Sequence, residues 1–96
     1  MRYPLIIRRI VGQSMLPTLR SDNLVVATGV YGSITKGDLV IFQHQGIDKI
    51  KRVENIRVKE FYVLGDNPSS SSDSRNFGWL PLDIIKAKVI WPKTKQ

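Results

Sequence analysis

Short apolar runs, each closed by turn residues, constrain the fold of this chain more than any other feature. Runs of this kind cover residues 22–28, 39–43, 47–56, 60–64 and 84–91. Most alternate apolar and polar residues, the pattern of a half-buried strand, and the third predicts a partly exposed, bulged strand. Only residues 14–20 look helical, and Pro17 limits them to about one turn. The pattern predicts a mainly β fold, a small antiparallel β-barrel-like domain with one short helical turn.

The length of 96 residues allows one domain, because two would leave neither half a core. We expect it to span residues 1–96, with 1–10 as an N-terminal lead-in and 92–96 as a basic tail. The apolar run at residues 5–7 ends at Arg8, far short of the roughly 20 residues of a spanning helix or the 7 to 15 of a secretory leader. We therefore expect a cytoplasmic location, with peripheral contact at an anionic membrane surface as the alternative.

The available residue types narrow the possible chemistry. The sequence has no cysteine and a single histidine, His44, so disulfides, thiolate or multi-histidine metal sites and cysteine nucleophiles are excluded. We expect no metal or cofactor, with chemistry performed by Ser, Lys, Arg, carboxylate or backbone groups. The net charge of +7 indicates an acidic partner, substrate or surface.

Two polar segments interrupt the strand pattern. Residues 12–18 form a loop that leads into the predicted turn, and residues 65–75 form a longer loop with four consecutive serines. Loops of that length in a small domain are usually functional or disordered. Asp66 and Asn67 can fix turns through side-chain hydrogen bonds, and Asp73 with Arg75 can anchor the far end by charge. An ordered, functional loop is therefore expected.

With no cysteine available, a serine is the natural nucleophile, and it needs a base to remove its proton. We interpret His44 as a solvent-exposed loop histidine. A lysine can serve where burial favours the neutral amine, and Ser–Lys pairs are a known variant of the catalytic triad. Lys49 and Lys51 share one face of a predicted strand, and spacing alone leaves both open, because most lysines are solvated.

Four short boxes, in the same order, resemble those of the type I signal peptidase family of Ser/Lys serine peptidases. They are residues 13–19 (QSMLPTL), 36–40 (KGDLV), 50–53 (IKRV) and 65–75 (GDNPSSSSDSR). A single box would be weak, but the ordered set covers nearly the whole chain. The short, anchorless sequence is most similar to the nickel-type superoxide dismutase maturation protease subgroup. The resemblance implies the β-fold of the signal peptidase catalytic core.

The resemblance implies that Ser14 is the nucleophile and Lys51 the general base, in preference to Lys49. Neutral Lys51 would accept the Ser14 proton, and later protonate the leaving amine and activate water. The expected activity is a serine endopeptidase that removes an N-terminal extension from a precursor, here a nickel-type superoxide dismutase precursor, bound as an extended strand. Signal peptide processing at a membrane surface is the alternative.

The resemblance also implies roles for the polar loop. Ser71 would hydrogen-bond to the lysine amine and orient it. Asp73 and Arg75 would pair and hold the loop beneath the site, and Asp66 and Asn67 would shape the start of the loop.

Further support is expected from the nucleophile loop. Gln13 belongs to its box, and Met15 would shield Ser14 from water. The Ser14 backbone N–H would donate to the oxyanion. Gly12 stands where many members carry a serine as a second donor, and losing such a donor costs on the order of 10²-fold in rate.

Two other functions remain as alternatives. A non-enzymatic β-barrel could bind nucleic acid through its basic residues, although we interpret Lys86, Lys88, Lys93 and Lys95 as a solvated face and tail, and expect no nucleic-acid partner. Such a module would leave Lys51 in water, whereas a peptidase buries it near Ser14. A self-cleaving repressor-type protease would need a DNA-binding domain and a cleavage segment, for which residues 1–13 leave no room.

Overall fold

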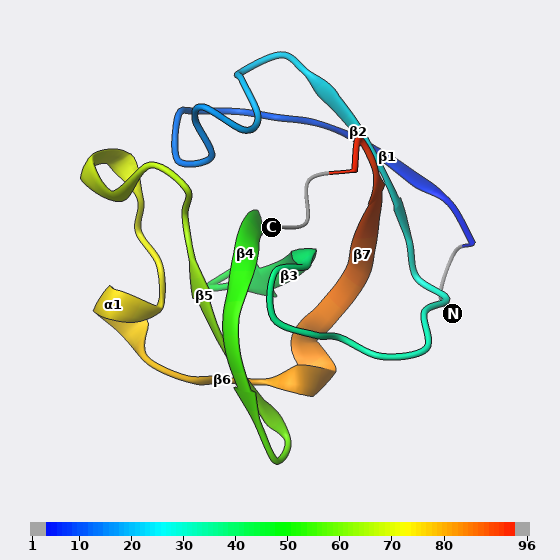
Figure 1. Cartoon of the computed structure of the whole chain (residues 1–96), viewed down its shortest axis with the longest axis vertical. Coiled ribbons are helices and arrows are strands. Elements are labelled where there is room, and N and C mark those ends of the chain that lie inside the picture. Colours follow the sequence, from blue (N-terminus) through cyan, green and yellow to red (C-terminus); the bar gives the residue numbers. More distant parts are fainter. Residues whose placement is uncertain (1–3, 94–96) are drawn as a thin grey trace.

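A computed structural model describes residues 4–93, in which seven strands form one sheet. The strands are β1 (Ile6–Arg9), β2 (Leu24–Thr28), β3 (Leu39–His44), β4 (Ile47–Arg57), β5 (Glu60–Leu64), β6 (Leu80–Pro81) and β7 (Ile85–Trp91). Their order in the sheet is β1-β2-β7-β3-β4-β5-β6, and every neighbouring pair is antiparallel. Figure 1 shows the strands curling around an open ring, so the predicted mainly β, barrel-like fold is confirmed.

All five predicted strands form, and their ends move by no more than two residues. Two others were missed. β1 lies in the expected lead-in, where three of its four residues are exposed and no alternation marks a strand. β6 is only two residues long, which is too short for any periodic pattern. Neither strand buries enough side chains to leave a sequence signal.

The short helices lie mostly where none was expected. The segment over residues 14–18 is a turn closed by the Leu19 N–H, which donates to the Met15 carbonyl at 2.9 Å. The α-helix α1 (Ser74–Phe77) lies in the polar loop, which also contains the 3-10 helix η1 (Pro68–Ser70), and η2 (Leu82–Ile84) precedes β7. Within the described chain, no helix is long and apolar enough to cross a membrane.

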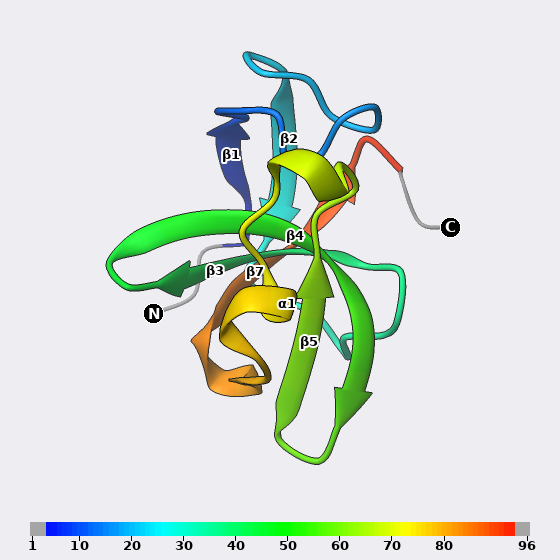
Figure 2. The ribbon, with the colours of Figure 1, turned by 90° about the vertical axis from the view of Figure 1, so that its left-hand side faces the viewer.

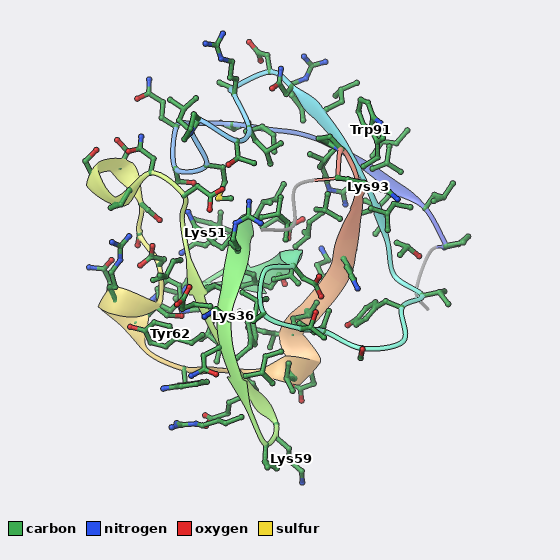
Figure 3. The ribbon with its side chains drawn as sticks, in the orientation of Figure 1. Lys36, Lys51, Lys59, Tyr62, Trp91 and Lys93 are labelled. Atoms are coloured by element: carbon green, nitrogen blue, oxygen red, sulfur yellow. The ribbon has the colours of Figure 1, made fainter. Side chains whose placement is uncertain are left out.

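A bulge turns the end of β7 outward. Val26 pairs with Trp91 and Ala27 pairs with Val89, so Ile90 is an extra residue that breaks the alternation. Trp91, at the end of this strand, is therefore 58% exposed, and Figure 3 shows it directed away from the molecule. Of the predicted basic tail, residues 94–96 lie outside the described residues.

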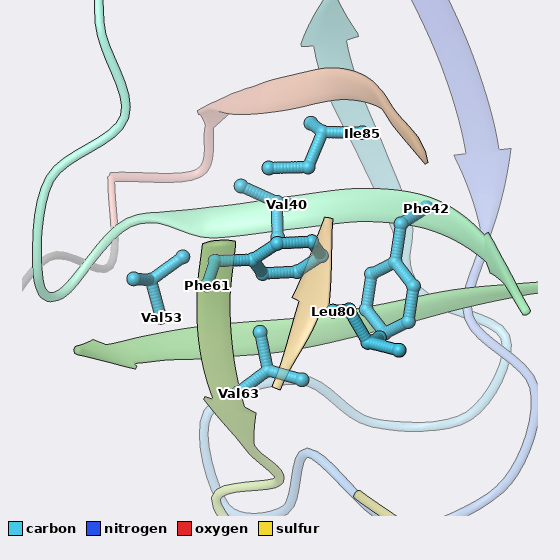
Figure 4. Close-up of a cluster of buried hydrophobic side chains, with 7 residues drawn as sticks. All are labelled: Val40, Phe42, Val53, Phe61, Val63, Leu80 and Ile85. Carbon is cyan, nitrogen blue, oxygen red and sulfur yellow. The ribbon is translucent and has the colours of Figure 1, made fainter. Parts of the chain in front are cut away.

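The buried apolar side chains form three clusters, and β3 contributes to each of them. The larger core packs around an edge-on contact between Phe42 and Phe61, with ring centroids 5.4 Å apart (Figure 4). The second contains Met15 and Leu19 from the loop after β1, packed against Leu39. The first four residues of β3 are all buried, because alternate side chains pack in the larger core and in the two smaller clusters. The predicted nucleophile loop is therefore anchored by its own apolar side chains.

The first half of β4 has one free edge. Residues 47–52 pair with β3, but pairing with β5 begins only at Arg52. Figure 2 shows β4 as one long, curved strand that runs from the β3 hairpin to the β5 hairpin. Within residues 4–93, β1 at the end of the sheet also has a free edge. A backbone edge that is not paired within the sheet can accept another strand.

Candidate active site

The Ser14 loop is a tight turn held between two buried anchors. Met15 and Leu19 are each 2% exposed, and the Leu16 N–H donates to the Gln13 carbonyl at 3.2 Å. Ser14 itself is half-buried. Burial of Met15, the neighbour of Ser14, therefore fixes the turn that carries the Ser14 side chain.

A pocket of about 440 Å³ lies beside this turn. Ser14 and Met15 line one side, and Lys49, Ile50 and Lys51 of β4 line the other. The rest of the wall comes from residues 8–11, in β1 and the loop after it, and from Ile41, Ile47 and Asp48. The two predicted catalytic side chains therefore meet in one cavity, between the free edges of β1 and β4.

Lys51 is 5% exposed and lies opposite Val40 of the larger core. Burial lowers the pKa of the Lys51 amine below its usual value, and the positive charges of Lys49 and Arg75 lower it further, against the opposing effect of the Asp73 carboxylate. Figure 3 shows Lys51 inside the ring of strands and loops, unlike Lys59 at the β4–β5 hairpin. This environment favours a neutral amine, the form that can accept a proton.

No hydrogen bond joins Lys51 Nζ to either Ser14 or Ser71 among the described residues. Ser71 Oγ instead donates to Asp73 Oδ2 at 2.8 Å. A hydroxyl can donate one hydrogen bond, and Ser71 donates it to the buried carboxylate. The lone pairs of the hydroxyl oxygen stay available as acceptors. The direct contact expected between Ser71 and the lysine amine is thus absent from this structure.

Asp73 is the fully buried centre of the polar loop. It accepts hydrogen bonds from the Gly65 N–H at 2.8 Å, from Ser71, and from Arg75 Nε at 2.9 Å and Nη2 at 2.6 Å. Burial alone would raise the pKa of the Asp73 carboxyl, but the hydrogen bonds from Arg75, Gly65 and Ser71 hold it far below its usual range. The ionised carboxylate ties the loop to the end of β5, close to Lys51.

Asn67 connects the polar loop to the nucleophile loop. Its backbone N–H donates to the Ser14 carbonyl at 2.8 Å, and its Nδ2 donates to the Gln13 carbonyl at 3.0 Å. Sequence analysis placed Asn67 at the start of the polar loop. In the structure Asn67 also positions the backbone of the predicted nucleophile.

Asp66 holds the same two loops to β4. It accepts from Arg52 Nε at 2.9 Å and Nη2 at 2.8 Å, and from the Thr18 hydroxyl, while Arg52 Nη1 donates to the Gly37 carbonyl at 2.8 Å. Burial would raise the pKa of the Asp66 carboxyl, but hydrogen bonds from Arg52 and Thr18 lower it instead. Lys51 and its neighbour Arg52 thus point to opposite faces of β4. Lys51 lines the pocket, and Arg52 binds the Asp66 carboxylate that holds the two loops.

Three supporting residues received no role from the sequence. Arg52 and Thr18 hold Asp66, and Gly65 allows the closest approach of the loops. A Cβ on Gly65 would overlap the Ser71 side chain and come within 2.8 Å of the Ser14 carbonyl oxygen. All three stand inside the four boxes, so the signal was present, but only the contacts show what each residue does.

The expected oxyanion donor is the backbone N–H of Ser14, since Gly12 has no side chain that could donate. Within the described chain, the Ser14 N–H donates to no other group, so it is free to bind a developing oxyanion. Gly12 adopts a φ of +89°, in an exposed position where a Cβ would meet nothing within 4 Å.

His44 differs from its predicted exposed state. It ends β3 half-buried, with its ring 4.4 Å from that of Phe77 and its Nδ1 3.3 Å from Lys49 Nζ. His44 does not line the pocket. Sequence analysis overlooked these partners because α1, which carries Phe77, was not expected.

Comparison with known proteins adds two findings. The Peptidase S24-like family matches residues 2–86, a range that contains every predicted site residue. The mitochondrial inner membrane protease subunit 1 of Schizosaccharomyces pombe is 33% identical over an alignment 110 positions long, which covers 84% of this chain and 70% of that protein.

Proposed function

We propose a function from one premise: the chain belongs to the Peptidase S24-like family. It is a β-rich peptidase of the signal-peptidase type. We propose that it is a serine endopeptidase in which Ser14 and Lys51 form the catalytic dyad, and that it removes N-terminal segments from precursor proteins.

One observation carries the proposal. Lys51 is buried on the wall of the pocket that Ser14 also lines, and its pKa is lowered by that burial. A binding module for nucleic acid would leave its lysines in water, where the charge can meet phosphates. A lysine that is shielded from water beside a serine suits proton transfer instead.

The reaction follows from these groups. Ser14 Oγ attacks the scissile carbonyl carbon while its proton moves to Lys51 Nζ, and the Ser14 N–H donates to the oxyanion. The C–N bond then breaks as Lys51 returns the proton to the leaving amine. Water, activated by the neutral amine, hydrolyses the acyl-enzyme. Catalytic hydrogen bonds are often long before substrate binds, and Ser14 Oγ must come within about 3 Å of Lys51 Nζ in the substrate complex.

The substrate class follows from the strand edges beside the pocket. An extended peptide can pair with the free edge of β4, of β1, or of both, which places its backbone along the pocket. Ile10, Met15 and Ile41 offer it an apolar floor. A segment that is unfolded at the cut, such as the N-terminal extension of a precursor, fits this geometry.

Two kinds of precursor are candidates. The resemblance found in the sequence favours a nickel-type superoxide dismutase precursor. The relative named as an inner membrane protease subunit favours a precursor with a membrane-directed leader. A cytoplasmic location and independence from any cofactor stay predictions.

The test is intact-mass analysis of both precursors after incubation with the purified chain. We expect one new N-terminus per cleaved precursor, and a rate at least about 10³-fold lower with Ser14→Ala, since removal of a nucleophile leaves only residual catalysis. The matched control is Ser72→Ala, an exposed serine of the polar loop. Cleavage by Ser14→Ala at the wild-type rate would exclude Ser14 as the nucleophile, and no cleavage of any precursor would contradict the proposed activity.

A further inference from the structure

Lys49 lies in the pocket without a role in the proposed reaction. It precedes Lys51 by two residues on β4, so both side chains leave the same face of the strand. Both line the pocket, and Lys49 is half-buried where Lys51 is buried. Two positions along a strand correspond to about 6.5–7 Å. The Lys49 side chain therefore lies next to that of Lys51, the proposed base, along the same face of β4.

The other cations of the pocket wall face carboxylates. Arg8 lies 3.9 Å from Asp48, and Arg9 lies 3.9 Å from Asp22. Asp48 also pairs with Lys86 at 3.2 Å, so its charge is shared by two cations. Asp48 also lines the pocket, but as the neighbour of Lys49 in the strand it points to the other face, toward Arg8 and Lys86.

The charge of Lys49 is positioned but not neutralised. Its Nζ lies 3.3 Å from His44 Nδ1 and 5.0 Å from the centre of the Phe77 ring. Among the described residues, no carboxylate lies within 4.0 Å of it. An imidazole and an aromatic face fix where the ammonium points without cancelling its charge. Such a preorganised cation favours a negatively charged ligand.

A bound substrate would bring its own side chains to Lys49. A peptide paired with the free edge of residues 47–51 directs alternate side chains to the face that carries Lys49 and Lys51. Substrate residues two positions apart then lie beside these two lysines in turn. One substrate position close to the scissile bond is therefore held against Lys49.

Resting on the proposed function, we propose that Lys49 is a specificity residue that selects precursors with Asp or Glu at this position. The carboxylate would accept a charge-assisted hydrogen bond from Lys49 Nζ. The partly exposed site limits the gain, and we expect about a 3- to 10-fold preference in kcat/KM for an acidic residue over its amide.

The experiment uses peptides that span the cleavage site of a precursor cut in a Ser14-dependent manner. Glu and Gln are placed in turn at each of the positions around the scissile bond. One position is expected to favour Glu by about 3- to 10-fold in kcat/KM. Lys49→Met should bring this ratio close to one, and Lys49→Glu should favour a Lys peptide at the same position. That gain on a new peptide cannot result from misfolding.

Lys59→Met is the matched control, because Lys59 is an exposed lysine at the distant β4–β5 hairpin (Figure 3). It should keep the full preference, which separates a local contact from the overall positive charge. Equal rates for Glu and Gln at every position would overturn this inference and leave the Ser–Lys peptidase standing. A preference that survives in Lys49→Met would also overturn it. Absence of any Ser14-dependent cleavage would overturn both proposals.

Discussion

The burial of Lys51 is a property that its neighbours in the sequence do not predict. Spacing left Lys49 and Lys51 equal, and the choice between them came from a resemblance. Both lie opposite residues of the larger core, but Lys51 is 5% exposed, whereas Lys49 is half-buried against His44 and Phe77. Burial depends on which strands and loops cover a position, so it cannot be deduced from a pair of lysines in a strand.

The lowered pKa of Lys51 predicts the pH dependence of activity. Because the neutral amine is the base, kcat/KM should rise with pH around the Lys51 pKa, with a midpoint below the usual value of about 10.4 for lysine. Lys49 contributes to the lowering, so Lys49→Met should move the midpoint upward, while Lys59→Met should leave it unchanged. Steady-state kinetics on a neutral peptide measure this, and a midpoint identical in all three proteins would refute the electrostatic coupling.

Gly65 is a residue whose importance is steric. A Cβ there would meet Ser71 and the Ser14 carbonyl, so Gly65→Ala should cost about 1–3 kcal/mol in the free energy of unfolding and also lower kcat. Gly32→Ala is the control, because nothing lies within 4 Å of the position of its added Cβ. Urea denaturation and precursor cleavage measure the two effects, and a fully active, fully stable Gly65→Ala would contradict the close approach.

Among the elements, the strands were predictable and the loops only in part. β2, β3, β4, β5 and β7 carry apolar patterns, because each covers a core. β1 and β6 lack such a pattern and are held by backbone pairing to a neighbour, which leaves little trace in the side chains.

The polar loop follows the same logic. The Asp73–Arg75 pair was expected from charge and spacing and is present at 2.6 Å. The hydrogen bonds of Asn67 to the backbone of Gln13 and Ser14 could not be foreseen, because they join segments more than fifty residues apart. Long-range contacts to backbone atoms have no sequence signature.

The ion pair between Asp66 and Arg52 joins the polar loop to β4, so we expect its loss to lower the stability of the fold strongly. Asp66→Asn removes the carboxylate that pairs with the buried Arg52 guanidinium, and should cost about 3–5 kcal/mol in the free energy of unfolding. Glu60→Gln removes the exposed pair with Arg57 and should cost less than about 1 kcal/mol. Urea denaturation compares the two, and equal costs would show that burial does not matter at Asp66.

For the whole molecule, the buried Asp73 and Lys51 and the partly buried Asp66 set how stability depends on pH. The pKa values of the Asp66 and Asp73 carboxyls are lowered in the folded state, so their stabilising effect is complete above the unfolded value of about 3.9 and is lost as the pH falls below it. Acid unfolding followed by circular dichroism should begin in that range. Stability that stays constant from pH 5 to well below pH 3 would contradict these assignments.

Lys51 acts in the opposite direction. Between its lowered pKa and about 10.4 the unfolded chain binds more protons than the folded one, so stability rises with pH there. Lys51→Met removes the cost of burying the amine, and should raise the free energy of unfolding at pH 7 by about 1 kcal/mol or more while abolishing cleavage. Thermal unfolding against pH tests this, with Lys36→Met, an exposed lysine, as the control. A Lys51→Met variant less stable than the wild type would show that the interactions of the amine stabilise the fold by more than its burial costs.

The protonation of Lys51 decides whether Ser14 has a base, and it can be observed without any substrate. The protein would be labelled with ¹³C at lysine Cε and titrated by NMR, with Lys51→Met to assign the Lys51 signal. The structure predicts that Lys51 titrates below the usual value of about 10.4 for lysine. A Lys51 signal that titrates together with the exposed lysines would contradict the Ser14–Lys51 dyad.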